Sequence, residues 1–134
     1  MSHITLLDVP IVEAALLFMV LQELGMVVDR SRRLMEVLDE QGRAKKVEAM
    51  AETQEGLRVG IRRTEDGRLE VLPDWRTARD RERFARQVEA IRNRIRQRYS
   101  YHKVKREIEK RGLSVVEEQE LPDGSIRLVV RSWR

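Results

Sequence analysis

Two tyrosines and one of the two histidines of this 134-residue chain fall within six consecutive positions, 97–102, which read QRYSYH. Phenol and imidazole groups this close together can supply a general acid and a general base for proton transfer. The chain shows no nucleophile with an orienting base, no phosphate-binding loop and no paired-carboxylate motif. In the competing interpretation, the rings of Tyr99 and Tyr101 fill a small core, and their hydroxyls and the His102 imidazole form hydrogen bonds at its margin. The sequence favours this structural role and predicts no catalytic residue.

The two histidines, His3 and His102, raise the question of a metal site. Such a site would need both imidazoles and carboxylates such as Glu117 or Glu118, brought together by the fold. Histidine and glutamate side chains lie near each other far more often than they bind a metal. The chain also contains no cysteine, which excludes disulfides, thiolate ligands and cysteine nucleophiles. We therefore expect neither a metal nor another cofactor.

Positive charge is concentrated between residues 76 and 111, which hold 14 Arg or Lys and 5 Asp or Glu, a local net charge of +9. The whole chain has a net charge of only +4, so the remainder is acidic. Five arginines of this segment suit the binding of nucleic-acid phosphates: Arg79, Arg83, Arg86, Arg94 and Arg98. Against a nucleic-acid site, acidic residues interrupt the segment and few aromatic residues are present for base stacking. A solvated helix face, or one that meets an acidic surface, explains the same pattern.

Length and composition predict a single domain, residues 1–134, of a globular and highly charged protein with 41% hydrophobic and 37% charged residues. The first ten residues lack the basic start of a signal peptide and contain Asp8 and Pro10. The longest apolar run, residues 14–21, is shorter than half of a membrane-spanning helix. These features predict a cytoplasmic protein that does not enter the membrane.

The spacing of apolar residues predicts the elements that position these groups. A strand at 3–9 precedes a helix at 11–24, which ends at Gly25, and a short strand follows. Residues 33–53 are ambiguous, because their composition favours helix whereas 39–43 resembles a turn between two strands. A hairpin follows at 57–71.

The longest predicted helix begins near Asp74 or Thr77, either of which can cap it, and ends at Gly112. It carries two apolar stripes, one formed by Phe84, Val88, Ile91 and Ile95 and the other by Tyr101, Val104 and Ile108. The six-residue step between the stripes does not fit the helical period, so the buried face rotates or the helix breaks near Tyr99. The order of elements predicts an α+β fold: a mostly antiparallel sheet with two main helices packed on one face, ending in a β-hairpin.

The segment QRYSYH and the residues after it resemble the hypothetical chloroplast reading frame 35 family, also catalogued as bacterial domain of unknown function 1257. Its members typically begin Met-Ser-His-Phe, carry Gln-Arg-Tyr-Ala-Tyr-His, and end with an Asp-Gly-Ser-Ile-Arg hairpin and Arg-Trp. The matching positions that we single out as candidate functional residues are His3, Gln97, Arg98, Tyr99, Tyr101, His102, Asp123, Arg127 and Trp133. The resemblance implies that residues 33–53 form strands, and it implies no mechanism.

The helix expected at 11–24 contains eight consecutive apolar residues, so every face is apolar through its middle. Because a small domain has difficulty covering such a helix, we expect a second subunit or a protein partner to contact it. The residues of this expected contact are Leu16, Leu17, Phe18, Met19 and Val20. The first hypothesis is therefore a non-catalytic domain that acts through protein–protein contact, as an oligomer subunit or accessory factor. The alternative is RNA or DNA binding through residues 76–111, and a weaker alternative is an enzyme or ligand-binding protein using Tyr99, Tyr101 and His102.

Overall fold

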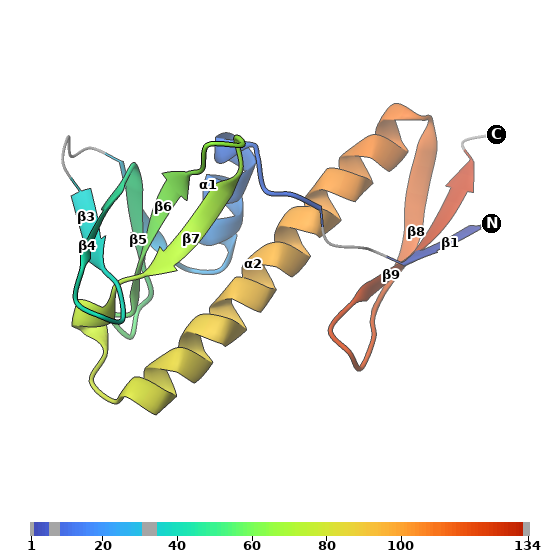
Figure 1. Cartoon of the computed structure of the whole chain (residues 1–134). Coiled ribbons are helices and arrows are strands. Elements are labelled where there is room, and N and C mark those ends of the chain that lie inside the picture. The colour runs from blue at the N-terminus through green and yellow to red at the C-terminus, as the bar shows by residue number, and fades with distance from the viewer. Residues whose placement is uncertain (1, 6–8, 31–34, 133–134) are drawn as a thin grey trace. The chain divides into compact units, whose positions relative to one another are not determined.

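The computed structural model describes residues 2–5, 9–30 and 35–132 (Figure 1). Within these ranges the elements are β1 (Ser2–Thr5), α1 (Ala14–Glu23), β2 (Val27–Asp29), β3 (Met35–Leu38), β4 (Ala44–Val47), β5 (Ala49–Glu52), β6 (Arg58–Arg63), β7 (Leu69–Pro73), the 3-10 helix η1 (Trp75–Thr77), α2 (Arg81–Lys110), β8 (Leu113–Glu120) and β9 (Ile126–Ser132). The chain divides into two compact units, one of residues 10–95 and the other of residues 1–9 and 96–134.

The unit of residues 10–95 contains a four-stranded antiparallel sheet with the strand order β2-β5-β6-β7. Residues that pair directly across antiparallel strands lie on the same face of the sheet. One face carries Ala51, Val59 and Ile61, each 1% exposed. Helix α1 contributes four further core residues, which are Leu16, Leu17, Val20 and Leu21. Both apolar sets follow directly from the alternation and helical spacing of the sequence.

The opposite face of this sheet is covered by the two-stranded hairpin of β3 and β4. Its side chains Met35, Val37 and Val47 form a second small core, against which Met50 and Leu72 of the sheet pack. Met50 and Leu72 are the two register partners of Gly60 on β6, so all three lie in one row across the sheet. The hairpin therefore sits over this row.

Gly60 is the position at which the hairpin and the sheet approach most closely. A Cβ atom at this position would lie 2.5 Å from Cγ1 of Val47 and 2.9 Å from Cγ1 of Val37. Separations of this size are shorter than van der Waals contact, so a glycine is needed here for space.

Asp74 joins three parts of this unit. Its side chain is fully buried, and Oδ1 accepts hydrogen bonds from the Leu38 amide at 3.0 Å and from Nε of Arg76 at 3.1 Å. Its own amide donates to the Arg58 carbonyl at 2.8 Å. Asp74 thus caps η1, whereas α2 begins after Asp80, whose Oδ1 accepts from the Arg83 amide at 3.1 Å. The expectation that Asp74 or Thr77 caps the long helix is therefore wrong.

Helix α2 is continuous over its 30 residues and does not break at Tyr99. Its buried face rotates instead. At about 100° per residue, the direction of Phe84, Val88 and Ile95 differs by roughly 130° from that of Tyr101 and Ile108. The sequence left rotation and breakage open, and the structure shows rotation.

The other unit contains a three-stranded antiparallel sheet with the order β1-β9-β8. Alternate residues of β9, namely Ile126, Leu128 and Val130, form a cluster with Tyr101 and Ile108 of α2. A bulge between Val115 and Glu117 shifts the register of β8. The Ser100 hydroxyl accepts a hydrogen bond from the Val9 amide at 3.2 Å and so fastens the segment after β1 to the helix.

The α+β class, the antiparallel pairing and the terminal hairpin are confirmed, and residues 35–52 form strands as the resemblance implied. The expectation of one sheet with both helices on one face needs correction, because the described strands form three sheets. The single domain stays a prediction. No helix of the described part of the chain is long and apolar enough to span a membrane.

Replacing Gly60 with Ala tests the close approach of the hairpin. The added methyl group must displace Val47 or Val37, and overpacking of this kind costs about 1–3 kcal/mol of the free energy of unfolding. Urea denaturation should show this loss, and the loss should be smaller when Val47→Ala is already present. A Gly60→Ala protein as stable as the parent would contradict the packing described here.

Candidate functional site

Helix α2 and strand β8 bring together the polar groups of the QRYSYH segment. The Tyr101 hydroxyl donates a hydrogen bond to Oε1 of Glu118. Lys105, one helical turn further on, donates from Nζ to the Tyr101 oxygen at 3.2 Å and lies 4.0 Å from Glu118 Oε1. Glu118 faces the helix because it pairs with the buried Leu128 in the sheet. The three groups form a closed set of hydrogen bonds and charges at the margin of the apolar cluster.

The Tyr101 ring is held by cations and by a second ring. The guanidinium carbon of Arg98 lies 4.5 Å from the ring centroid, and Nζ of Lys105 lies 5.5 Å from it. The His102 ring stands edge-on to Tyr101 with the two centroids 5.1 Å apart. Each cation–π contact of this kind contributes about 0.5–1 kcal/mol. The ring, which is 5% exposed, is therefore fixed from several sides.

The protonation of this cluster limits its chemistry. Burial raises the pKa of Tyr101, and the hydrogen bond to Glu118 raises it further, while the bond from Lys105 acts in the opposite direction. The hydrogen bond with Tyr101 raises the pKa of Lys105. Both groups therefore keep their protons near neutral pH. A general base or a nucleophile must be deprotonated near neutral pH. Tyr101 and Lys105 are therefore better suited to donating hydrogen bonds than to accepting a proton.

Gln97 and Asp123 shape the turn between β8 and β9. The Gln97 amide donates to the Gly124 carbonyl and lies 3.5 Å from Oε1 of Glu120. Asp123 accepts from the hydroxyl of Ser125 at 2.6 Å and from its amide at 3.0 Å, and these bonds lower the pKa of Asp123. Gly124 has φ +87°, a left-handed conformation that favours glycine. Gln97 and Asp123 thus have a geometric role, which is the attachment of the hairpin to α2 and the shaping of its turn.

The remaining motif candidates lie apart from this cluster. Tyr99 is fully buried, on the helix face that carries Phe84 rather than on that of Tyr101. Arg127 is half-buried on β9, and the backbone of His3 pairs with Val129. Trp133 lies outside the described residues. Within the described ranges, no three His, Asp or Glu side chains gather in a way that could hold a metal ion.

The structure separates the arginines proposed for phosphate binding. Arg83, Arg86 and Arg94 are exposed on α2 within an arc of roughly 80°. Arg79 is exposed just before the helix. Arg98 is half-buried and lies over the Tyr101 ring.

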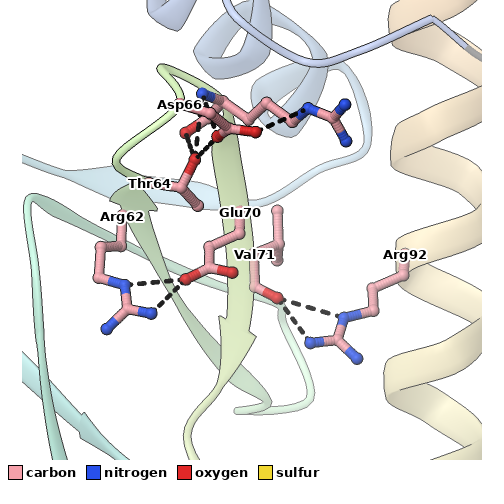
Figure 2. A network of polar contacts seen from close by, with 7 residues as sticks. Arg62, Thr64, Asp66, Glu70, Val71 and Arg92 are labelled. Atoms are coloured by element: carbon pink, nitrogen blue, oxygen red, sulfur yellow. Dashed lines mark hydrogen bonds and ion pairs between the residues drawn. The ribbon is translucent and has the colours of Figure 1, made fainter.

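Other arginines of the unit of residues 10–95 connect its secondary-structure elements, as Figure 2 shows. Nε and Nη2 of Arg92 donate to the Val71 carbonyl at 3.2 and 2.7 Å and so join α2 to β7. On the neighbouring strands, Arg62 binds Glu70 through Nε at 2.8 Å. Some of the arginines therefore use their positive charge in contacts that stabilise the fold.

The apolar helix α1 is covered more completely than we expected. Leu16, Leu17 and Val20 are at most 3% exposed within the chain itself. Phe18 is half-buried and lies 4.6 Å from the guanidinium carbon of Arg30. Met19 is the residue of the five that is exposed, at 42%. The premise that the chain cannot cover this helix is therefore wrong for three of its residues, and the predicted contact with a partner stays a prediction.

Sequence reasoning missed a groove beside strand β2. The groove has a volume of about 420 Å³ and is lined by residues that include Val27, Asp29, Met35, Met50, Arg58 and Arg76; we call it the β2 groove. Val27 is 75% exposed. The signal in the sequence was the pair Val27–Val28. Adjacent strand residues point to opposite faces of a sheet, so two consecutive valines place one apolar side chain on each face, and both faces need cover.

Replacing Tyr101 separates the roles of its ring and hydroxyl. Tyr101→Ala should cost about 3–5 kcal/mol of unfolding free energy at neutral pH, and Tyr101→Phe about 0.5–1.5 kcal/mol. Because the pKa of Tyr101 is raised in the folded state, its stabilisation is full below the unfolded pKa and disappears as pH rises through the folded one. Raising the pH above about 10 should therefore lower the melting temperature of the parent more than that of the Tyr101→Phe variant.

Glu118→Gln should flatten the same alkaline loss, and Glu117→Gln, which changes the neighbouring carboxylate on the other face of β8, should not. An alkaline melting profile unchanged by both Tyr101→Phe and Glu118→Gln would refute the proposed hydrogen bonding.

The comparisons with known proteins bear on the same residues. The family described as "Protein of unknown function (DUF1257)" matches residues 20–129. Neither the curated proteins nor the solved structures gave a match. The matched range contains the 97–102 segment and most of the β8–β9 hairpin, while His3 and Trp133 lie outside it. The chain belongs to the DUF1257 family of proteins of unknown function.

Proposed function

We propose that this chain is a non-catalytic protein-binding domain, which works as an oligomer subunit or as an accessory factor. The observation that carries the proposal is the β2 groove, an open and partly apolar surface beside the outermost strand of a sheet. Such a strand edge is a template for pairing with another chain, and an exposed apolar surface beside it adds area to the contact.

The chemistry of the motif cluster supports the non-catalytic part of this proposal. Tyr101, Lys105 and Glu118 bind one another, and Gln97 binds the β8–β9 turn. Their raised pKa values keep Tyr101 and Lys105 protonated. These groups are engaged in holding the hairpin to the helix, which is a sufficient reason for their presence.

The proposal predicts a specific assembly. Light scattering of the purified chain over a wide concentration range distinguishes a monomer of 15.8 kDa from an oligomer. If the chain is an accessory factor, it should be monomeric alone and should capture a protein in near-equal amount when tagged in its native host. The tag alone is the control. A chain that stays monomeric and captures no protein in comparable amount would contradict the proposal.

A second candidate function, nucleic-acid binding, rests on the exposed stripe of Arg83, Arg86 and Arg94. Three guanidinium groups within a narrow arc can contact successive phosphates of one strand. The same stripe suits a solvated helix face, which is why this function stands second.

The arginine stripe predicts a salt-dependent affinity for RNA. With a labelled polyuridine oligonucleotide, Arg83→Ala/Arg86→Ala/Arg94→Ala should make the slope of log K against log salt less steep by about 2. A control with the same loss of charge, Arg43→Ala/Lys46→Ala/Arg131→Ala, changes exposed residues that are not part of α2 and should keep most of the slope. The absence of binding at low salt, or equal effects of the two triple variants, would eliminate this function.

A further inference from the structure

We propose that a small pocket beside Trp75 binds the proline ring of an extended segment of a protein partner, which carries an acidic residue next to the proline. This inference rests on the proposed function and gives it a second contact of stated chemistry. The pocket has a volume of about 100 Å³ and is lined by residues that include Val37, Lys45, Arg62, Leu72, Pro73 and Trp75; we call it the Trp75 pocket. It shares no lining residue with the β2 groove. All of its lining residues and their chain neighbours belong to the described range 35–132.

The Trp75 pocket lies between the β3–β4 hairpin and the four-stranded sheet. Val37 and Lys45 are register partners in the hairpin, so both side chains point to the same face of it. Val37 belongs to the small core against which Leu72 packs, so this face looks toward the sheet. Arg62 lies two positions along β6 from the register partner of Leu72 and therefore shares the covered face. Trp75 of η1, two residues after the end of β7, completes the lining.

The Trp75 ring is held in place before any partner binds. The Phe84 ring stands edge-on to it with the two centroids 4.8 Å apart, and the guanidinium carbon of Arg81 lies 5.0 Å from the Trp75 centroid. Nη2 of Arg81 also donates to the carbonyl oxygen of Glu40 at 3.3 Å. Trp75 is nevertheless only half-buried. A side chain that is already fixed loses little conformational entropy when a ligand packs against it.

The size of the Trp75 pocket selects one side chain of a larger partner. Sites for small molecules usually have volumes of about 300–1,000 Å³. An apolar cavity of about 150 Å³ is large enough for benzene. The Trp75 pocket, at about 100 Å³, suits a single apolar side chain, and the rest of a polypeptide segment would supply further contacts.

An aromatic wall and an unused hydrogen-bond donor favour proline over other apolar side chains. Proline-rich segments form polyproline II helices, which dock in aromatic-lined grooves and whose backbone carbonyls have no internal hydrogen bond. Among the described residues, no acceptor binds the indole N–H of Trp75. Because an indole N–H at an interface usually finds an acceptor, that of Trp75 can donate to a carbonyl beside the bound proline.

The charges of the Trp75 pocket favour an acidic residue in the partner. Three charged side chains line it, those of Asp39, Lys45 and Arg62. Oδ1 of Asp39 accepts from two backbone amides of its own turn, at 2.8 and 3.0 Å, and Nε of Arg62 binds Glu70 at 2.8 Å (Figure 2). In the part of the chain that the structure describes, no group forms a hydrogen bond or ion pair with the Lys45 ammonium. A carboxylate next to the proline of the partner therefore complements Lys45.

The test uses the full chain labelled with ¹⁵N and a capped nonapeptide of three proline–proline–aspartate repeats. The peptide should shift the indole N–H signal of Trp75 and the amide signals of Val37 and Leu72. Lys45→Glu should weaken binding by roughly tenfold, because it places two carboxylates together. A proline–proline–lysine nonapeptide should show the reverse preference and bind Lys45→Glu more tightly than the parent. The matched control Arg43→Glu makes the same change of charge at an exposed residue outside the pocket lining and should bind like the parent.

Four results would overturn the inference. One is a Trp75 indole signal that the proline–proline–aspartate peptide does not move. Another is equal binding of a glycine–serine–aspartate or a glycine–leucine–aspartate peptide, which would remove the role of proline. The third is equal binding of the aspartate and lysine peptides by the parent, a comparison that needs no variant. The fourth is a shift of the Trp75 signal with protein concentration alone, which would assign the pocket to a second copy of this chain.

The capture experiment distinguishes this inference from the function on which it rests. If tagged Lys45→Glu, with a melting temperature equal to that of the parent, still captures a protein in near-equal amount, the Trp75 pocket is not the binding site and the protein-binding function stands. If the parent chain neither assembles nor captures a protein, the proposed function fails and the inference fails with it.

Discussion

The structure depends on one constraint, which is that helix α2 buries two different faces along its length. Its first half buries Phe84, Val88 and Ile95, and its second half buries Tyr101 and Ile108 about 130° away. The face that carries Arg83 and Arg94 in the first half is the face that becomes apolar in the second. Exposed arginines in one half and a buried tyrosine in the other are therefore two consequences of the same rotation, and the basic charge needs no nucleic acid to explain it.

The rotation brings a tyrosine hydroxyl to the edge of an apolar cluster, where it needs a hydrogen-bond partner. A buried hydroxyl without one costs about 1–3 kcal/mol. Glu118 supplies the acceptor, and Lys105 balances the charge of Glu118 while it donates to Tyr101. Burial and the hydrogen bond to Glu118 raise the pKa of Tyr101, and the hydrogen bond with Tyr101 raises the pKa of Lys105, so the arrangement that stabilises the hairpin also reduces the reactivity of both groups.

Local patterns allowed much of the fold to be predicted, and non-local contacts account for what was missed. The hairpins and the two stripes of α2 followed from alternation, turn residues and helical spacing. The role of Asp74 depends on the Leu38 amide, 36 residues away in the chain. The packing of the β3–β4 hairpin over the sheet depends on the close approach of Val47 to Gly60, which no local pattern records. Of the candidate site, the association of Tyr101 with the final hairpin was predicted, whereas its bond to Glu118 required the register of β8.

Two of the outer strands, β2 and β8, are protected to different degrees, and this difference gives the β2 groove its significance. Strand β8 ends in exposed glutamates and a glutamine, and charged side chains on an outer strand oppose pairing with another chain. Strand β2 instead carries Val27, which is 75% exposed, against 48% for Val116 of β8. The β3–β4 hairpin packs over the row of Gly60, whereas Val27, in the next row of the sheet with Glu52 and Arg58, stays exposed. The same face of the sheet therefore carries both the close packing that requires a glycine at position 60 and the groove beside β2.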